Sequence, residues 1–106
     1  MHLAMDLEGA DGPVIALSGE VDMLVADQLR SAGETAIAHA EAKSSQRLVI
    51  DLGEVTFLDS TGIGALVAIS NAAGAAGVAL VLRAVSPRIS KLLAITGLDG
   101  VFATED

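Results

Sequence analysis

The residues best suited to chemistry lie in one short segment, Asp59-Ser-Thr-Gly-Ile-Gly64. This segment follows a strand-like apolar run and opens an uncharged apolar run that is typical of a buried helix. Ser60 is therefore expected at a helix N-terminus, where a hydroxyl commonly caps the first turn. The same position suits a docking surface, because Gly62 and Gly64 remove side chains there and let another backbone approach. The residues alone leave both roles open.

Other starting points for chemistry have less support. His2 lies near the N-terminus, and His39 lies in a helical segment without an HxxxH partner. We therefore interpret His39 as a solvated helix residue and not as a metal ligand. Gly62 and Gly64 follow a strand and open a helix, but Val67 stands where a dinucleotide fingerprint needs its third glycine. A nucleotide site is not expected.

Two pairs of acids, Glu20 with Asp22 and Glu54 with Asp59, could act as paired carboxylates. No aromatic residue of a pocket and no basic partner accompanies them, so we interpret them as solvated acids at strand ends. The sequence also contains no GxxxxGK[ST] and no GxSxG motif. We expect no catalytic residue, no metal ligand and no cofactor, and a chain that is not an enzyme.

Composition excludes further classes. The 106 residues carry a net charge of −8, and the aromatic residues are Phe57 and Phe102. Such a chain repels phosphate and lacks platforms for base stacking, so nucleic acid is not an expected partner. The absence of cysteine excludes disulfides and suits a reducing cytoplasm, where we expect the protein. Residues 60–82 are uncharged, but their Ala and Gly content and Asn71 argue against membrane insertion.

Periodicity and punctuation predict the elements that position these residues. Asp22 is expected to be the N-cap of a helix over residues 24–42, and a second helix should start at Ser60 or Thr61. Ser86-Pro87 reads as N-cap and N1 of a third helix that ends at Gly97-Leu98. Strands are expected over residues 3–7, 14–17, 47–52, 78–82 and 101–103. The order β-β-α-β-α-β-α-β predicts one α/β domain over residues 1–106, with a mixed, mostly parallel β-sheet, an N-terminal hairpin and about three helices.

Three motifs resemble those of the STAS-domain family, specifically anti-sigma factor antagonists of the sporulation and general stress type. They occur in family order and cover nearly the whole chain, and the Asp-Ser-Thr-Gly-Ile-Gly block is the specific one. The motifs are Leu17-Ser-Gly-Glu-Val-Asp22, then Leu48-Val-Ile-Asp-Leu52 with Phe57-Leu-Asp-Ser-Thr-Gly-Ile-Gly64, then Ser86-Pro87 with Leu92-Leu-Ala-Ile-Thr-Gly-Leu98. The resemblance implies a single STAS domain.

The resemblance also implies a phosphorylation switch. In that family the unphosphorylated antagonist binds an anti-sigma factor, which is a histidine-kinase-like ATPase acting as a serine kinase, and so frees a sigma factor. The kinase then phosphorylates the motif serine, here Ser60, and a PP2C-type phosphatase restores the active form. Thr61 is an alternative acceptor. The acid of the Gly-Glu-x-Asp motif lies beside that serine in the family fold. We therefore expect a partner-binding surface made of Asp22, Asp59, Thr61, Gly62, Ile63 and Gly64.

One departure from the family pattern concerns the residues after Asp22. Met23 and Leu24 stand where family members often carry polar residues. If these two side chains are exposed, they make the partner-binding surface more apolar. The interpretation we favour is that Leu24 packs under the following helix.

The resemblance also admits another class of protein, a non-switching STAS scaffold or a regulatory subunit of a stress-signalling complex or of an ABC lipid transporter. Phosphorylation of Ser60 distinguishes the two classes.

Overall fold

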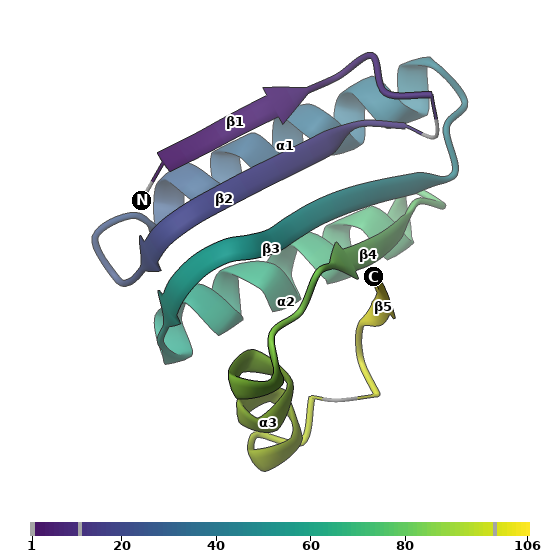
Figure 1. Cartoon of the computed structure of the whole chain (residues 1–106). Helices are drawn as coiled ribbons and strands as arrows, with labels where there is room; N and C mark the ends of the chain where they lie inside the picture. The colour runs from purple at the N-terminus through teal and green to yellow at the C-terminus, as the bar shows by residue number, and fades with distance from the viewer. Residues whose placement is uncertain (1, 11, 99) are drawn as a thin grey trace.

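The structure of the protein is a computed structural model, and it describes residues 2–10, 12–98 and 100–106. Five strands among these residues form one sheet in the order β1-β2-β3-β4-β5 (Figure 1). β1 and β2 pair antiparallel, and the other neighbours pair parallel. The predicted α/β class, the N-terminal hairpin and the order of elements are confirmed. The elements are β1 (His2–Asp6), β2 (Val14–Val21), α1 (Ala26–Ala42), β3 (Arg47–Leu58), α2 (Ser60–Ala75), β4 (Ala79–Arg83), α3 (Pro87–Ile95) and β5 (Ala103–Glu105).

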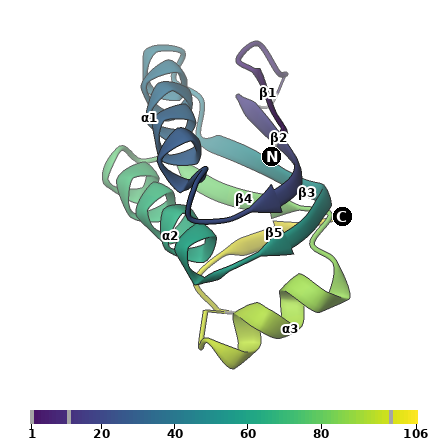
Figure 2. The same cartoon turned by 90° about the vertical axis from the view of Figure 1, so that its left-hand side faces the viewer.

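The three helices lie in two separate positions relative to the sheet. α1 and α2 lie side by side over one face of the sheet, whereas α3 lies apart from them, beyond the end of that sheet (Figure 2). The core fills the space between the sheet and the first two helices, and each large side chain buried there contributes roughly 1.5–3 kcal/mol. Its largest fully buried members include Ile15, Leu29, Ile50, Leu66 and Leu82.

β3 is longer than predicted, and its irregularity explains the error. The alternation of buried side chains stops after Leu52, which is where the sequence placed the end of the strand. β3 in fact continues to Leu58, because it remains paired with β2 through two register shifts, each of which adds one residue to β3. These bulges change the spacing of buried side chains from two residues to three, so that Leu52, Val55 and Leu58 all face the core.

Other strand boundaries also differ from the expectation. β2 runs on to Val21, four residues beyond the predicted end at Leu17, because it pairs with the extended β3. The last strand is Ala103–Glu105 instead of residues 101–103, and it pairs with β4. These differences arise from pairing with other strands, which periodicity along one segment does not report.

The predicted ends of α3 are confirmed. The Ser86 hydroxyl accepts a hydrogen bond from the Ile89 N–H at 3.2 Å, and Pro87 is the first helical residue. At the other end Gly97 has a φ of 76°, and the Leu98 N–H donates to the Leu93 carbonyl at 2.8 Å. This pairing is a Schellman motif, in which glycine supplies the left-handed conformation that ends the helix.

The prediction that Asp22 caps α1 is wrong. α1 begins at Ala26, its N-cap position is Val25, and no side chain caps it. The Asp22 carboxylate accepts instead from the Leu24 N–H at 3.0 Å, and the Val25 N–H donates to the Asp22 carbonyl at 3.2 Å. Asp22 therefore stabilises a separate turn that precedes the helix, a common use of an aspartate side chain.

The interpretation of His39 as a solvated residue is also wrong. Its side chain is only 22% exposed, and its Nε2 lies 3.5 Å from Glu8 Oε1. Glu8 belongs to the turn between β1 and β2, so His39 packs the end of α1 against that hairpin. The periodicity of α1 alone did not reveal this contact, because the hairpin that covers His39 is distant in the sequence.

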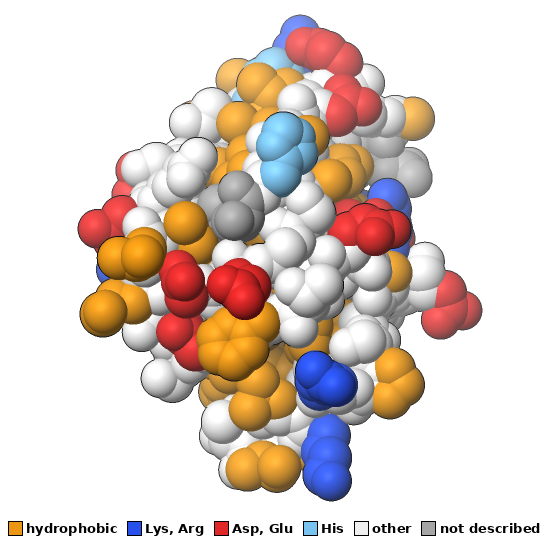
Figure 3. Space-filling view, turned by 60° about the vertical axis from the view of Figure 1, so that its left-hand side comes forward, with side chains coloured by type: hydrophobic (Ala, Val, Ile, Leu, Met, Phe, Trp, Pro, Cys, Tyr) orange, Lys and Arg blue, Asp and Glu red, His pale blue; other side chains and the backbone are white. Residues whose placement is uncertain are grey.

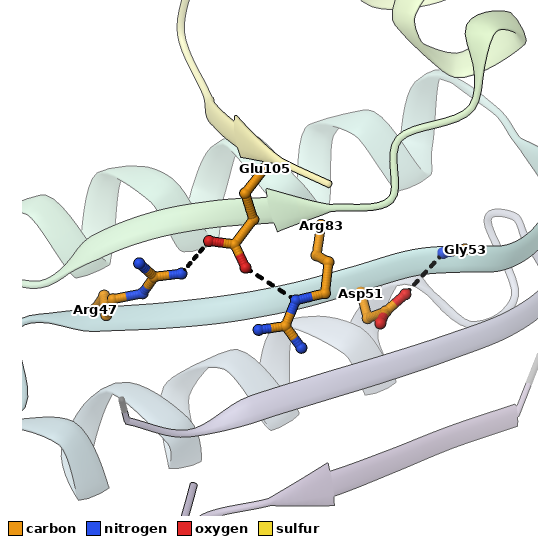
Figure 4. Close-up of polar contacts among 5 residues, drawn as sticks. All are labelled: Arg47, Asp51, Gly53, Arg83 and Glu105. Atoms are coloured by element: carbon orange, nitrogen blue, oxygen red, sulfur yellow. Dashed lines mark hydrogen bonds and ion pairs between the residues drawn. The ribbon is translucent and has the colours of Figure 1, made fainter. Parts of the chain in front are cut away.

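Ion pairs tie the last strand to the sheet. The Glu105 carboxylate accepts a hydrogen bond from Arg47 of β3, and its Oε2 accepts from Arg83 Nε of β4 at 2.9 Å (Figure 4). In the same view Asp51 Oδ1 accepts from the Gly53 N–H at 2.8 Å, within β3. The hydrogen bonds from Arg47 and then from Arg83 hold the pKa of Glu105 below its ordinary value of 4.5.

Candidate functional site

The ends of two parallel strands bring the predicted acids to one edge of the sheet. Val21 of β2 pairs with Leu58 of β3, and Asp22 and Asp59 are the residues that follow them. The Asp59 N–H donates to the Val21 carbonyl at 3.3 Å, which ties the start of α2 to the end of β2. Residues 37 positions apart in the chain are thereby neighbours at the carboxyl edge of the sheet, where open α/β sheets place their functional groups.

Asp59 is the residue that caps α2. Its Oδ1 accepts from the Gly62 N–H at 2.9 Å, and its carbonyl accepts from the Ile63 N–H at 2.9 Å. Ser60 follows as the first helical residue, and its side chain is exposed. None of the side-chain hydrogen bonds among the described residues involves the Ser60 hydroxyl. The Asp59 carboxylate therefore caps the helix, and the Ser60 hydroxyl remains available to another molecule.

Gly62 and Gly64 have different roles in the first turns of α2. A Cβ atom at Gly62 would lie 2.7 Å from both the Val21 carbonyl oxygen and Leu58 Cδ1. Gly62 is buried, and its lack of a side chain lets α2 pack directly on the end of β2. A Cβ at Gly64 would meet nothing within 4 Å, and this residue is half-buried. Of these two glycines, only Gly64 therefore leaves room at the surface of the protein for another molecule.

The remaining predicted site residues lie at different depths. Thr61 is half-buried next to Ser60, and Ile63 is buried in the core. Ile63 and Gly62 therefore support the surface from beneath. The predicted residues that reach the surface at this edge are Asp22, Asp59, Ser60, Thr61 and Gly64.

Two apolar side chains stand beside these residues. Met23 is 69% exposed and Leu24 is 86% exposed. The expectation that Leu24 packs under the helix is wrong, because α1 begins only at Ala26 and leaves Leu24 in the preceding turn. Figure 3 shows hydrophobic and acidic side chains together on one face of the molecule, with basic side chains towards its lower margin. Exposed apolar residues rimmed by polar ones are typical of protein–protein contact sites.

The carboxyl edge of β2 and β3 is strongly acidic. Asp22 and Asp59 follow these strand ends and Glu20 is the last residue but one of β2, whereas Glu54 lies within β3, four residues before its end. In the part of the chain that the structure describes, none of the four takes part in an ion pair. The arrangement presents an exposed serine hydroxyl next to two carboxylates, Asp22 and Asp59.

Residues 2–10, 12–98 and 100–106 contain no cluster of three or more histidine, aspartate or glutamate side chains that could hold a metal ion. No helix within these ranges is both long enough and apolar enough to cross a membrane.

Comparisons with known proteins identify the family. A family model described as "Mlab, STAS domain" matches residues 5–103. This chain belongs to the STAS-domain family. It is 31% identical over 103 residues to an anti-sigma-B factor antagonist from Listeria monocytogenes, and the match covers 95% of this chain and 87% of the relative.

Solved structures support the same conclusion for this STAS domain. The crystal structure of an anti-sigma factor antagonist from Mycobacterium paratuberculosis is 34% identical, with a TM-score of 0.73 and coverage of 97% of this chain and 85% of the other. The Bacillus cell fate determinant SpoIIAA in its phosphorylated form has a TM-score of 0.73 at 22% identity, covering 99% and 92% of the two chains. The second likeness shows the fold alone. The family resemblance of the sequence is confirmed.

Proposed function

We propose that this STAS domain is a cytoplasmic anti-sigma factor antagonist that is switched by phosphorylation of Ser60. Unphosphorylated, it sequesters an anti-sigma factor and so frees a sigma factor. The observation that carries the proposal is the unpaired, exposed hydroxyl of Ser60 on the first turn of α2. Asp59 supplies the cap there and Gly62 the close packing, so the acceptor sits on a rigid platform. The names of its relatives support an anti-sigma factor as the partner.

The surface around Ser60 suits a protein partner. Met23 and Leu24 offer exposed apolar anchors, and Gly64 leaves room for a backbone to approach. Asp22 and Asp59 add negative charge, which helps to fix the orientation in which a partner binds. The partner contributes the complementary apolar groups, together with the groups that catalyse phosphoryl transfer.

The chain acts in this scheme as a substrate and not as an enzyme. The partner is an anti-sigma factor with serine kinase activity, and it supplies ATP and a base. Ser60 Oγ forms a bond to the γ-phosphorus while the bond from that phosphorus to the β,γ-bridging oxygen breaks. ADP leaves, and the hydroxyl proton passes to the base of the kinase. A PP2C-type phosphatase reverses the modification by hydrolysis, releasing inorganic phosphate. Thr61 is the alternative acceptor.

The phosphate would act on the interface and not on the fold. It adds about −1.5 to −2 charges at neutral pH, and the N-terminus of α2 tolerates negative charge through its dipole and free N–H groups. A doubly charged phosphate about 6 Å from one partner carboxylate is repelled by roughly 1.4 kcal/mol in water and about 5.5 kcal/mol at an effective dielectric constant of 20. Binding would weaken by roughly 10-fold to 10⁴-fold, which is enough to release the partner.

The experiment that tests the proposal is intact-mass spectrometry of the chain purified from its native cells, both growing and stressed. We expect a single phosphate whose level depends on the condition. Ser60→Ala should abolish it, while Thr61→Ala, which removes the neighbouring hydroxyl, should retain it. A phosphate that survives in Ser60→Ala and is lost in Thr61→Ala would move the acceptor to Thr61. A pull-down should capture the anti-sigma factor with the wild-type chain and lose it with Ser60→Asp.

A second function has one specific observation in its favour. The matching family model is described as "Mlab, STAS domain", which does not name an antagonist. The alternative is a non-switching STAS subunit of a stress-signalling complex or of an ABC lipid transporter. The absence of phosphate under all conditions, together with a complex that survives Ser60→Asp, would favour this alternative over the switch.

A further inference from the structure

A groove of about 360 Å³ lies between the carboxyl half of β3 and α3. Its lining is mainly apolar, and neither Ser60 nor Asp22 contributes to it. It is therefore distinct from the surface around the phosphoacceptor, although Leu58 connects the two. The apolar lining residues are Val55, Phe57 and Leu58 from β3 and Ile89, Leu92 and Ile95 from α3.

The second bulge of β3 places Phe57 in this groove. Gly19 of β2 pairs with Val55 and Glu20 pairs with Phe57, so Thr56 is the extra residue. If Thr56 were an ordinary paired residue of the strand, the simple alternation from buried Val55 would turn Phe57 inward. The bulge turns it outward, and its side chain is 50% exposed. Bulges commonly re-aim a side chain in this way, and a half-exposed phenyl ring offers a large apolar contact area.

α3 carries more apolar surface than the protein covers. Ile89 and Leu93 are buried and attach the helix to the core. Leu92 is half-buried and Ile95 is 72% exposed, and both line the groove. Ile89, Leu92 and Ile95 recur every three residues, so they form a continuous apolar edge that faces Phe57 across the groove.

The α3 side of the groove is basic, in contrast to the acidic protein as a whole and to Glu20, which pairs with Phe57 on the side of the sheet. Arg88 and Lys91 line it, both are exposed, and neither forms an ion pair with the described residues. Three of the other four cations form ion pairs, Arg30 with Asp27 and both Arg47 and Arg83 with Glu105, whereas Lys43 at the end of α1 forms none with the described residues. Two unpaired positive charges and exposed apolar surface therefore coincide at this groove.

We propose that this groove binds an acidic amphipathic segment of a partner protein, with its apolar side chains on Phe57 and Ile95 and its carboxylates against Arg88 and Lys91. The hollow shape suits a helix or an extended peptide, the mode in which an apolar face docks into a groove. A net charge of −8 disfavours an anionic lipid surface, because the rest of the molecule is repelled from it. The inference extends the proposed function by a second contact that Ser60 does not form.

The test uses the full chain and two synthetic peptides of about four helical turns. One repeats Leu on one face and Glu on the other, and the matched peptide carries Lys in place of Glu. Titrations are followed by the backbone amide signals of the ¹⁵N-labelled protein. We expect the acidic peptide to shift the signals of Phe57 and α3 and to bind more weakly as salt is added. The basic peptide should not bind there.

Charge reversal provides the matched variants. Arg88→Glu with Lys91→Glu should lower the affinity for the acidic peptide by about tenfold or more, because attraction at the rim becomes repulsion. Arg30→Glu with Lys43→Glu makes the same change in net charge on α1 and at its C-terminal end, and should change the affinity by less than about twofold. Ile95→Ser, at an exposed position, should also weaken binding while the amide spectrum of the free protein is retained.

Four outcomes would overturn the proposal. Equal affinity for the two peptides would remove the charge complementarity, and shifts confined to other surfaces would remove the site. Binding of phosphatidylglycerol vesicles in place of the acidic peptide would assign the groove to a membrane. Concentration-dependent shifts of the same signals without peptide would assign it to a second copy. The groove variants retain Ser60, so their phosphorylation in cells tests the switch separately.

Discussion

The N-termini of α1 and α2 lie at the same edge of the sheet but are built in opposite ways. α2 follows β3 directly, with Asp59 as a side-chain cap and Gly62 packed against β2. α1 follows β2 only after an exposed turn, and its N-cap position, Val25, provides no side-chain hydrogen bond. One end is tightly positioned, and the other displays two uncovered apolar side chains.

Under the proposed function, this difference separates two requirements of the switch. A phosphoacceptor must be presented in a reproducible geometry to a kinase, which the capped end of α2 provides. A docking surface must leave apolar side chains outside the core, which the uncapped turn before α1 does. Stability measurements on paired substitutions test whether the two ends differ as the structure indicates.

The largest difference is expected for the two glycines of α2. Gly62→Ala should destabilise the protein by about 2 kcal/mol, since its Cβ would overlap the Val21 carbonyl oxygen and Leu58. Gly64→Ala should stabilise it by about 0.5–1 kcal/mol, since the new methyl group meets nothing and alanine favours a helix. Urea denaturation of both variants measures the contrast. Equal effects would show that α2 does not pack on β2 in the way described.

A smaller contrast is expected between the two aspartates. Asp59→Ala should lower the free energy of unfolding by about 1 kcal/mol, as the loss of an N-cap does. Asp22→Ala removes a hydrogen bond in an exposed turn and should cost less than about 0.5 kcal/mol. Chemical denaturation at neutral pH checks both values. A larger cost for Asp22→Ala would mean that the turn before α1 is as firmly built as the start of α2.

Glu105 provides a reference outside both helix ends. Its pKa is lowered in the folded protein, so its stabilising effect is present above the ordinary value of 4.5 and is lost as the pH falls through the lowered value. Glu105→Gln should therefore be less stable than the wild type at neutral pH and approach it in acid. Denaturation at neutral pH and at about pH 3 measures the two limits. Glu41→Gln, an exposed glutamate without an ion pair among the described residues, is the control, and a similar pH profile for both variants would contradict a role for the arginines.

The smallest change in stability is expected at the exposed turn. Met23→Ser with Leu24→Ser should alter the free energy of unfolding by less than about 0.5 kcal/mol, because neither side chain is buried. The same variant should lose capture of the anti-sigma factor in a pull-down. Retained capture would remove these residues from the docking surface, and a large loss of stability would mean that they are covered.

Local signals predicted most of the fold. Helical periodicity, the Ser86-Pro87 cap and the Gly97-Leu98 end each depend on residues close together in the sequence, and these elements were confirmed. The predicted end of β3, Leu52, came too early because the bulges of this strand depend on its pairing with β2, and no single segment contains that information. His39 was misjudged for a similar reason, since the hairpin that covers it is distant in the sequence.

The candidate site was predicted unevenly. The motif around Ser60 indicated the right helix end, but the capping role that it suggested for the Ser60 hydroxyl is wrong. The structure gives the cap to Asp59, one residue before the serine. The exposure of Leu24 could not be predicted, because it depends on α1 beginning two residues later than its apolar pattern indicated. The groove beside α3 gave no sequence signal, since it requires the bulge that turns Phe57 outward.

The unpaired hydroxyl of Ser60 has a consequence for evolution. Because that side chain forms no hydrogen bond that stabilises the fold, replacement by alanine, threonine or aspartate should leave the free energy of unfolding about unchanged. Natural selection on stability therefore does not act at position 60, in contrast to Asp59 and Gly62 on either side of it. Under the proposed function, a serine retained there across related chains would be a record of signalling alone, and its loss in a lineage would mark the point at which that lineage abandoned the proposed switch.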